Sequence, residues 1–296
     1  MRLLIIGGTG FIGPYVAREL CERGDEVTVF HRGEHESELS PAVTHVRSAQ
    51  AGMPVLEFPA GEFDVVIHMI AMGEADARAA VKAFAGRVGR MVVPSSGDVY
   101  RAYGRFAGME AGWLEKGLLT EDSPLRTVLY PYRAQAKSPD ELAHYYEKIL
   151  VEREAMGNPQ LPATVLRLPK VYGPGNNADL ATVYAYRDHP DWRWTHGYVE
   201  NVAQAIVLVA VHPAAAGRIY NAGEEYTPTV GERLKTLPAS TVQPAPDSAF
   251  DFRQDIAYDT SRIRKELGYK ERISYEEGLK RTLPDTPGLK AGTASA

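Results

Sequence analysis

The sequence predicts an α/β fold, in which a doubly wound parallel sheet is followed by a smaller C-terminal α/β lobe. Short apolar runs rich in β-branched residues alternate with amphipathic helical patterns along the chain. Several of these runs are hydrophobic at nearly every position, which is typical of strands that helices cover on both faces. With 296 residues, of which 44% are hydrophobic, the chain is long enough to bury a large core.

The elements follow in chain order from these patterns and from their end signals. Strands are expected at residues 2–7, 26–32, 43–48, 63–70, 90–96, 163–169 and 217–223. Helices are expected at residues 11–23, 74–85, 139–156, 198–211 and 259–268. The helix at 139–156 is the longest, because a capping box with proline at the first helical position starts it and a Gly-Asn-Pro run ends it.

The chain divides into three parts by pattern. Residues 1–170 form the predicted first domain, and residues 171–283 form a smaller lobe that is free to return a strand or helix to the first domain. Residues 284–296, rich in Pro, Gly, Ser and Ala, are expected to be a mobile tail.

Composition limits the function classes. The formal net charge of −5 gives no general electrostatic reason to bind nucleic acid. No apolar run approaches the ~18 residues of a membrane span, and the apolar start is too short for a secretory signal, so we expect a cytoplasmic protein. Cys21, the one cysteine, has no partner for a disulfide or a metal site, and no metal is expected.

The strongest motif is "LLIIGGTGFIGPYVARELCERG", a strand that runs into a glycine-rich turn and then into a helix. Gly7, Gly8, Gly10 and Gly13 let the chain turn tightly and bring backbone N–H groups against a pyrophosphate at the helix N-terminus. The alternative is a tight turn without a ligand. Because the motif starts the chain in the right strand–turn–helix context, we predict dinucleotide binding, with Phe11 and Ile12 in the same turn.

The residues that select between NAD and NADP are expected at the end of the second strand. NAD sites usually carry Asp or Glu there, whereas this chain has His31 and Arg32. An arginine can pair with a 2′-phosphate. The sequence therefore favours NADP over NAD, although Arg32 as a solvated turn residue remains an alternative.

Several motifs together resemble the extended short-chain dehydrogenase/reductases, also called the NAD-dependent epimerase/dehydratase family. The motifs are, in chain order, "GGTGFIG", "DVVIHMIA", "VVPSSGDVY", "EKILVE", "RLPKVYGPG", "GYVENVAQA" and "YDTSRIRKELGY". This likeness spans most of the chain. It implies an N-terminal Rossmann domain, a C-terminal substrate lobe and a homodimer formed through the helices at 74–85 and 139–156.

The resemblance also implies catalytic residues. Ser96, with Ser95 beside it, matches the family's catalytic hydroxyl, and Lys148 matches the lysine of YxxxK, which holds the nicotinamide ribose and lowers the pKa of the tyrosine. His144 stands where the family has that tyrosine. This departure puts the ordinary proton transfer in doubt.

Helical geometry leaves three alternatives for the proton donor. On a continuous helix His144 lies about 40° from Lys148 around the axis and Tyr145 about 60° to the other side, whereas Tyr146 lies about 160° away and is expected to pack. His144 can serve as the acid/base group, or Tyr145 can if the helix is rotated or distorted. In the third alternative the donor lies elsewhere or is missing.

Substrate contacts are expected after the strands at 90–96 and 163–169. The long connection 101–137 is a candidate lid or pocket wall. Candidate substrate residues are Ser95, Tyr100, Arg101, Tyr132, Arg133, Lys170 and Arg193. For each of them plain packing or solvent exposure is the competing interpretation, and His68, in an apolar strand, is expected to be a buried structural histidine.

Two functions remain from different classes. The first is an NAD(P)(H)-dependent oxidoreductase or epimerase that acts on a small polar carbonyl or hydroxyl compound, such as a nucleotide sugar. The second is a catalytically silent cofactor-binding protein that regulates a partner or binds RNA. The histidine at the tyrosine position motivates the second, while the acidic balance argues against its RNA version.

Overall fold

The computed structural model describes residues 1–33, 39–48, 57–177, 180–245 and 250–283. Its main sheet has seven parallel strands in the order β3-β2-β1-β4-β5-β6-β9. These strands are β1 (Arg2–Ile6), β2 (Glu26–His31), β3 (Thr44–Arg47), β4 (Val65–His68), β5 (Arg90–Ser96), β6 (Ala163–Leu168) and β9 (Ile219–Asn221). The predicted doubly wound α/β fold is confirmed.

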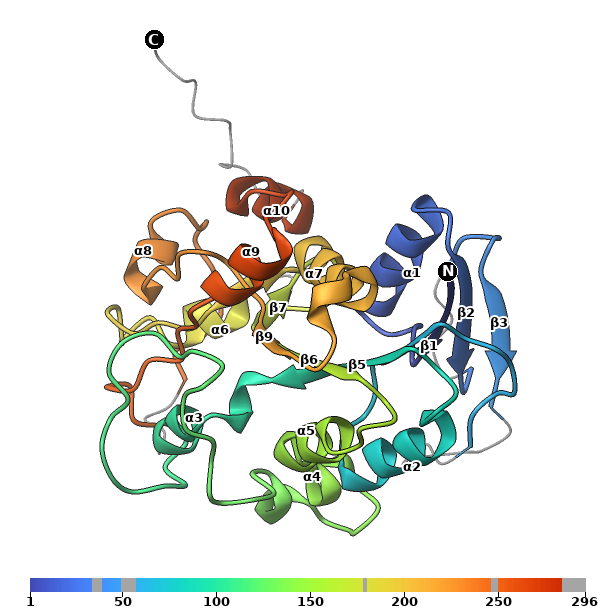
Figure 1. Ribbon diagram of the computed structural model, residues 1–296. Helices are drawn as coiled ribbons and strands as arrows, with labels where there is room; N and C mark the ends of the chain where they lie inside the picture. The colour runs from blue at the N-terminus through green and yellow to red at the C-terminus, as the bar shows by residue number, and fades with distance from the viewer. Residues whose placement is uncertain (34–38, 49–56, 178–179, 246–249, 284–296) are drawn as a thin grey trace.

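Helices cover both faces of this sheet (Figure 1). On one face lie α1 (Gly13–Glu22), α7 (Val199–Val211) and α9 (Ser261–Leu267), and on the other lie α2 (Glu74–Phe84), α4 (Leu142–Tyr145) and α5 (Lys148–Met156). The strand β1 shows why both faces are apolar. Leu3 and Ile5 pack into one core, while Leu4 and Ile6 pack into the other, since successive side chains of a strand point to opposite faces.

The smaller lobe is built mostly from the chain after β6. It holds a two-stranded parallel sheet and several short helices, which are β7 (Lys170–Tyr172), β8 (His196–Tyr198), α6 (Ala181–Ala185), α8 (Val230–Leu234) and α10 (Tyr275–Thr282). Its core is aromatic, because Phe106 stacks on Trp192 at 4.8 Å and on Phe250 at 4.6 Å between ring centroids. The buried Trp192 therefore packs in the lobe.

Other short elements connect the two parts. They are α3 (Arg101–Phe106) and the 3₁₀ helices η1 (Gly97–Val99), η2 (Arg133–Gln135) and η3 (Pro213–Ala215). Although α7 and β9 follow residue 170 in the chain, they join the main sheet layer, with β9 pairing with β6. The division into two domains at residue 170 stays a prediction, and the expected tail at 284–296 lies outside the described residues.

The predicted continuous helix at 139–156 is wrong. It is replaced by the single turn α4 and by α5, and the two residues between them, Tyr146 and Glu147, have extended backbone angles. The angles around one helix axis that placed His144, Tyr145 and Lys148 on a common face therefore do not apply.

Glu147 accounts for the break. Its backbone N–H donates to the Met72 carbonyl at 2.9 Å, and its carboxylate caps α5 by accepting the Ile149 N–H at 2.9 Å. The same carboxylate is fully buried and pairs with Arg126 at 3.0 Å. Because a buried carboxylate needs charged and N–H partners, these contacts fix residue 147 outside helical geometry.

Candidate active site

The glycine-rich turn follows β1 at the carboxyl edge of the sheet, between β2 and β4. Gly7 has φ +82°, which favours glycine, and a side chain on Gly13 would meet the Gly8 carbonyl oxygen at 2.3 Å. A side chain on Gly10 would instead enter open space. The first turn of α1 has no side-chain cap, and the N-terminal end of a helix favours an anion. These residues fit a dinucleotide pyrophosphate.

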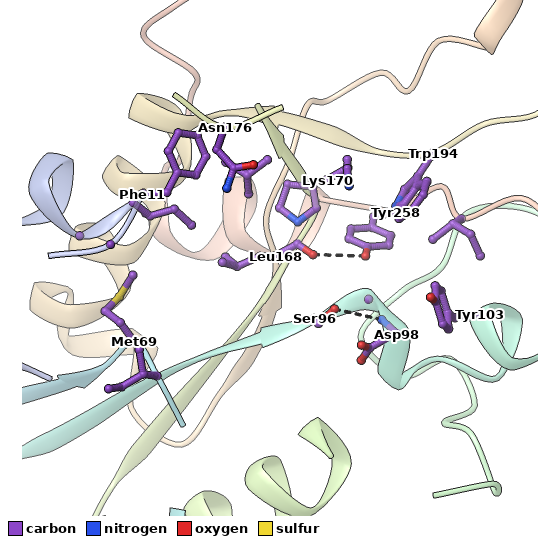
Figure 2. Close-up of a pocket in the computed structure, with 18 of the residues that line it drawn as sticks. Phe11, Met69, Ser96, Asp98, Tyr103, Leu168, Lys170, Asn176, Trp194 and Tyr258 are labelled. Atoms are coloured by element: carbon purple, nitrogen blue, oxygen red, sulfur yellow. Dashed lines mark hydrogen bonds between the residues drawn. The ribbon is translucent and has the colours of Figure 1, made fainter. Parts of the chain in front are cut away.

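A cavity of about 590 Å³ starts at this turn. It is lined by Gly7, Gly10, Phe11, Ile12, Gly13, Met69, Ile70, Ser96, Gly97, Asp98, Tyr103, Tyr132, Leu168, Pro169, Lys170, Val171, Asn176, Trp194, Ile256 and Tyr258. Figure 2 shows Phe11 and Met69 at one end, and Tyr103, Trp194 and Tyr258 at the other, with Ser96 below. The cavity therefore joins the cofactor turn to a second compartment walled by the small lobe and the 101–137 connection.

Ser96 and Lys148 lie close to the cavity, one in its wall and one behind it. Ser96 ends β5, and its Oγ accepts the Asp98 backbone N–H at 3.3 Å (Figure 2). Lys148 is buried at the start of α5, where its Nζ donates to the Ala71 carbonyl at 2.6 Å and to the Pro94 carbonyl at 3.1 Å. These two bonds fix the ammonium between the ends of β4 and β5.

Tyr146 is the tyrosine whose side chain lies beside Ser96 and Lys148. Its hydroxyl interacts with the Asp98 carboxyl and with the Ser96 hydroxyl, and its ring centroid is 6.0 Å from Lys148 Nζ. The extended backbone at the helix break aims the ring there. The predicted packing of Tyr146 is observed, because its ring lies 5.2 Å from that of Tyr132 between centroids. The helix break in addition brings its hydroxyl to Asp98 and Ser96, which the prediction did not include.

Asp98 is the centre of a buried polar cluster. Its Oδ2 accepts the Tyr132 hydroxyl at 3.0 Å, and the Tyr132 hydroxyl lies 3.1 Å from that of Tyr103. Burial raises the pKa of the Asp98 carboxyl, while the charge of Arg126 and the hydroxyls of Tyr146 and Tyr132 lower it. The cluster is able to hold and pass protons next to Ser96.

Burial also shifts the pKa values of Tyr146 and Lys148 and so sets their charge states. It raises the pKa of Tyr146 well above its usual value, with the charge of Asp98 adding to the rise. It lowers the pKa of Lys148 to about 8, against the opposing charges of Asp98, Asp76 and Glu152. At neutral pH Tyr146 is thus a protonated hydroxyl beside a charged ammonium.

For His144 and Tyr145, no contact with Ser96 is present among the described residues. The His144 carbonyl accepts a hydrogen bond from Arg133 Nε at 2.9 Å, and no contact in the described part of the chain joins its ring to Ser96 or Lys148. Tyr145 packs against Gly73, and the charges of Asp76 and Arg32 act on its hydroxyl. The structure does not bring either residue to Ser96.

The predicted cofactor-selecting residues stand at the end of β2. His31 is buried, and its Nε2 lies 3.2 Å from Nδ1 of His45 on β3. Arg32 is partly exposed after the strand and lies close enough to Tyr145 to affect its pKa. Residues 34–38, which continue this edge, lie outside the described part of the chain.

Of the predicted substrate residues, Tyr132 and Lys170 line the cavity. Ser95 is buried and donates to Glu152 at 2.5 Å, and Tyr100 is buried and donates to Asn221 at 2.6 Å, so substrate contact does not fit either residue. The remaining predicted residues, Arg101, Arg133 and Arg193, do not line the cavity.

Several cavity residues were missed by sequence reasoning. Asp98 lies within "SSGDVY" at the carboxyl end of a parallel strand, and this position is a signal that could have found it. Tyr258, by contrast, reaches the cavity from beyond β9, and its hydroxyl donates to the Leu168 carbonyl at 3.3 Å. It also occupies the space that a side chain at Gly97 would need. No local pattern marks such a contact.

Two further findings bear on function class. In the described ranges, no group of three or more His, Cys, Asp or Glu residues is placed to hold a metal ion. Among the same residues, no helix combines the length and apolar character that a bilayer crossing requires. His68 is buried as expected, and burial lowers its pKa to about 3, so it stays neutral.

Known proteins resemble this chain over nearly its whole length. The model of the NAD dependent epimerase/dehydratase family matches residues 3–85. A dTDP-glucose 4,6-dehydratase of Streptomyces niveus is 27% identical, with 96% of this chain and 92% of that protein covered. Among solved structures, the Bordetella bronchiseptica enzyme WbmG in complex with NAD superposes with a TM-score of 0.70 at 16% identity, covering 96% of this chain and 93% of that one.

A second solved neighbour is TunA, described as an NAD-dependent NDP-hexosamine 5,6-dehydratase. It has a TM-score of 0.69 at 22% identity and covers 96% of each chain. At these identities the structures establish the shared fold, and the family model matches the N-terminal part of the chain. The predicted resemblance to the NAD-dependent epimerase/dehydratase family of extended short-chain dehydrogenase/reductases is therefore confirmed.

Proposed function

We propose that the protein is an NAD-dependent oxidoreductase of the epimerase/dehydratase type that acts on a nucleotide sugar, with Tyr146 in the role that the family gives to the YxxxK tyrosine. One observation carries the proposal: Ser96, Tyr146 and Lys148 converge beside a cavity that opens onto the glycine-rich turn. The names of the curated relatives support a nucleotide-sugar substrate. His144 has no part in this arrangement.

Each residue has a chemical task in this proposal. When bound, NAD supplies a hydride acceptor and donor. The Ser96 hydroxyl, at the cavity wall, orients the reacting hydroxyl or carbonyl oxygen. The Tyr146 hydroxyl exchanges a proton with that oxygen, and the Lys148 ammonium favours the ionised form of the tyrosine. The Asp98 cluster holds Tyr146 in place.

The protonation state of the Tyr146 hydroxyl determines whether it favours reduction or oxidation of the substrate. Because the pKa of Tyr146 is raised by burial and by Asp98, the hydroxyl is a donor at neutral pH. Donation suits carbonyl reduction. Oxidation of a sugar hydroxyl requires an ionised Tyr146 to accept the proton, and the positive charge of Lys148 favours that ionised form.

NAD is the proposed cofactor because solved neighbours contain it. The predicted NADP preference has one basis, the position of Arg32 after β2, where a guanidinium can pair with a 2′-phosphate. Calorimetric titration with NAD and with NADP, on wild type and on Arg32→Ala, separates the two. A loss of NADP affinity alone in the variant would assign the 2′-phosphate to Arg32.

Turnover tests the proposed function. Purified protein with NAD is incubated with dTDP-glucose, UDP-glucose and UDP-glucuronic acid, and the sugar products are identified by chromatography and mass spectrometry. We expect conversion of at least one of them, with Ser96→Ala slower by roughly 10²-fold or more. Tight NAD binding without conversion of any nucleotide sugar would reject the proposal.

A silent cofactor-binding protein is the second candidate. It is favoured by the fact that the Lys148 ammonium already donates to two backbone carbonyls and that neither Lys148 nor Tyr146 is among the residues lining the cavity. In that case NAD would bind without turnover, Ser96→Ala would leave NAD affinity unchanged, and NAD would control capture of a protein partner.

A further inference from the structure

Lys170 lies at the substrate end of the cavity. Ser96 and Leu168 are paired in register at the ends of β5 and β6, and Lys170 follows Leu168 by two residues. Figure 2 shows Lys170 beside Trp194 and Tyr258, away from Phe11 at the cofactor turn. Its place in the chain and in the cavity therefore puts it near the reacting end of a substrate.

The ammonium of Lys170 has no anionic partner within the described residues. Its Nζ lies 5.5 Å from the Trp194 ring centroid, and neither an ion pair nor a hydrogen bond of Nζ is present there. Burial lowers the pKa of this group, and no opposing contribution accompanies it. A cation held this way is incompletely compensated.

Among the described residues, no carboxylate opposes the effect of burial on the pKa of Lys170. Asp98 is the one acid in the described lining of the cavity, and its carboxyl is engaged by Tyr132 and Tyr146. Behind Lys170 lies the buried His196, whose pKa is lowered well below its usual value by burial and by the charges of Arg233 and Lys170. Among the described residues, this end of the cavity therefore carries the Lys170 ammonium without an adjacent counter-ion.

We infer that Lys170 binds an anionic oxygen group of the substrate, either a carboxylate on the sugar or a phosphate of the nucleotide. An ammonium is a compact point charge with rotatable donors, so it accepts either group, and desolvation in the cavity strengthens the pair. The inference rests on the proposed function, because it assigns part of the same substrate.

Matched ligands test the inference and separate the two sources. UDP-glucuronic acid and UDP-glucose differ at the sugar by a carboxylate, and both are titrated by calorimetry into NAD-loaded wild type, Lys170→Met and Lys170→Arg. Lys265→Met, on the exposed face of α9, is the control. We expect Lys170→Met to weaken binding of UDP-glucuronic acid by about tenfold or more, with partial recovery in Lys170→Arg.

The pattern across ligands identifies the group. If UDP-glucose affinity is unchanged in Lys170→Met, Lys170 binds the carboxylate, and if both ligands weaken equally, it binds the phosphate. Pyrophosphate and D-glucuronate, titrated alone, repeat the test without the nucleotide. Equal binding of all anionic probes to wild type and to Lys170→Met, or binding of none to wild type, overturns the inference. Turnover of a nucleotide sugar in the same preparation would show that the proposed function survives.

Discussion

Tyr146 sits two residues before Lys148, at a spacing that no YxxxK pattern contains, yet its hydroxyl meets Asp98 and Ser96. For two neighbours of similar chemistry, His144 and Tyr145, no such contact is present among the described residues. Three adjacent side chains thus compete for one role. They can be separated by single substitutions, because each has different contacts.

Tyr146→Phe is expected to slow turnover by roughly 10²-fold or more, because the substitution removes the proton-exchanging hydroxyl and keeps the ring. NAD affinity should stay within about twofold, since the glycine turn is untouched. Steady-state kinetics and calorimetry on the same protein check both expectations. Tyr145→Phe and His144→Ala are matched controls. A loss of turnover confined to His144→Ala would mean that His144, and not Tyr146, exchanges the proton.

The titration of Lys148 predicts that kcat/KM depends on pH. Its pKa is lowered to about 8 by burial, so the ammonium is charged below that pH and neutral above it. Since the charge favours ionisation of Tyr146, kcat/KM should fall as pH rises through about 8. In Lys148→Arg, whose guanidinium keeps its charge, the fall near this pH should disappear. An unchanged inflection in the variant would assign the titration to another group.

At the residue scale the local strand–turn–helix motif predicted the glycines, and the family resemblance implied Ser96 and Lys148. The role of Tyr146 was not predictable in this way. It depends on Glu147, whose geometry is fixed by Arg126, a residue 21 positions earlier. Placing residues 139–156 around the axis of one continuous helix does not take that contact into account.

The glycine turn is the element on which cofactor binding depends, and Gly10 isolates its function from its folding. An alanine methyl at Gly10 meets no protein atom within 4 Å, so it fills only the space in front of the turn. We expect Gly10→Ala to weaken NAD binding by at least about tenfold and to change the free energy of unfolding by less than about 0.5 kcal/mol. Calorimetry and urea denaturation measure the two effects.

Gly13→Ala is the contrasting variant for this turn. Its methyl would lie 2.3 Å from the Gly8 carbonyl oxygen, so loss of stability is expected together with loss of binding. If Gly10→Ala bound NAD as wild type does, the pyrophosphate would not lie against this turn.

The break between α4 and α5 gives the element-scale prediction for stability. Glu147→Ala leaves the fully buried Arg126 without its carboxylate and removes the cap of α5. We expect a loss of about 3–5 kcal/mol in the free energy of unfolding, measured by urea denaturation. Arg153→Ala, on the exposed face of α5, is the control and should lie within about 0.5 kcal/mol of wild type. A small effect in Glu147→Ala would mean that the ion pair does not hold the break.

Most elements of the sheet were predictable because most of its strands are short apolar runs and because helices such as α1 and α2 have a clear amphipathic period. Elements without such signals were not found. The strands β7 and β8 have three residues each, and they exist because Lys170–Tyr172 pairs with His196–Tyr198, a long-range contact. Short strands of this kind carry too few residues for a pattern.

At the scale of the whole molecule, the sheet order places the carboxyl ends of β1, β4, β5 and β6 along one edge, where the cavity lies. This arrangement follows from the doubly wound fold and could be predicted with it. The wall provided by Trp194, Ile256 and Tyr258 could not, because it requires the small lobe to fold over that edge.

The expected homodimer is a whole-molecule prediction. It uses the outer surfaces of α2 and α5, where Ala75 is exposed and Leu150 is partly exposed. Light scattering coupled to gel filtration should give twice the chain mass of 32.5 kDa. Ala75→Arg and Leu150→Arg should each shift the protein toward monomer, whereas Lys265→Met should not. A wild-type mass of one chain would contradict the prediction.

The central claim is that Tyr146, with Ser96, serves the reacting centre in place of the residue at the YxxxK position. A crystal structure of the protein with NAD and a nucleotide sugar tests it most directly. We predict that the Tyr146 hydroxyl and the Ser96 hydroxyl both lie within hydrogen-bond distance of the same sugar oxygen beside the nicotinamide ring. The account would be contradicted by a structure in which His144 or Tyr145 approaches the nicotinamide ring while Tyr146 lies remote from the sugar.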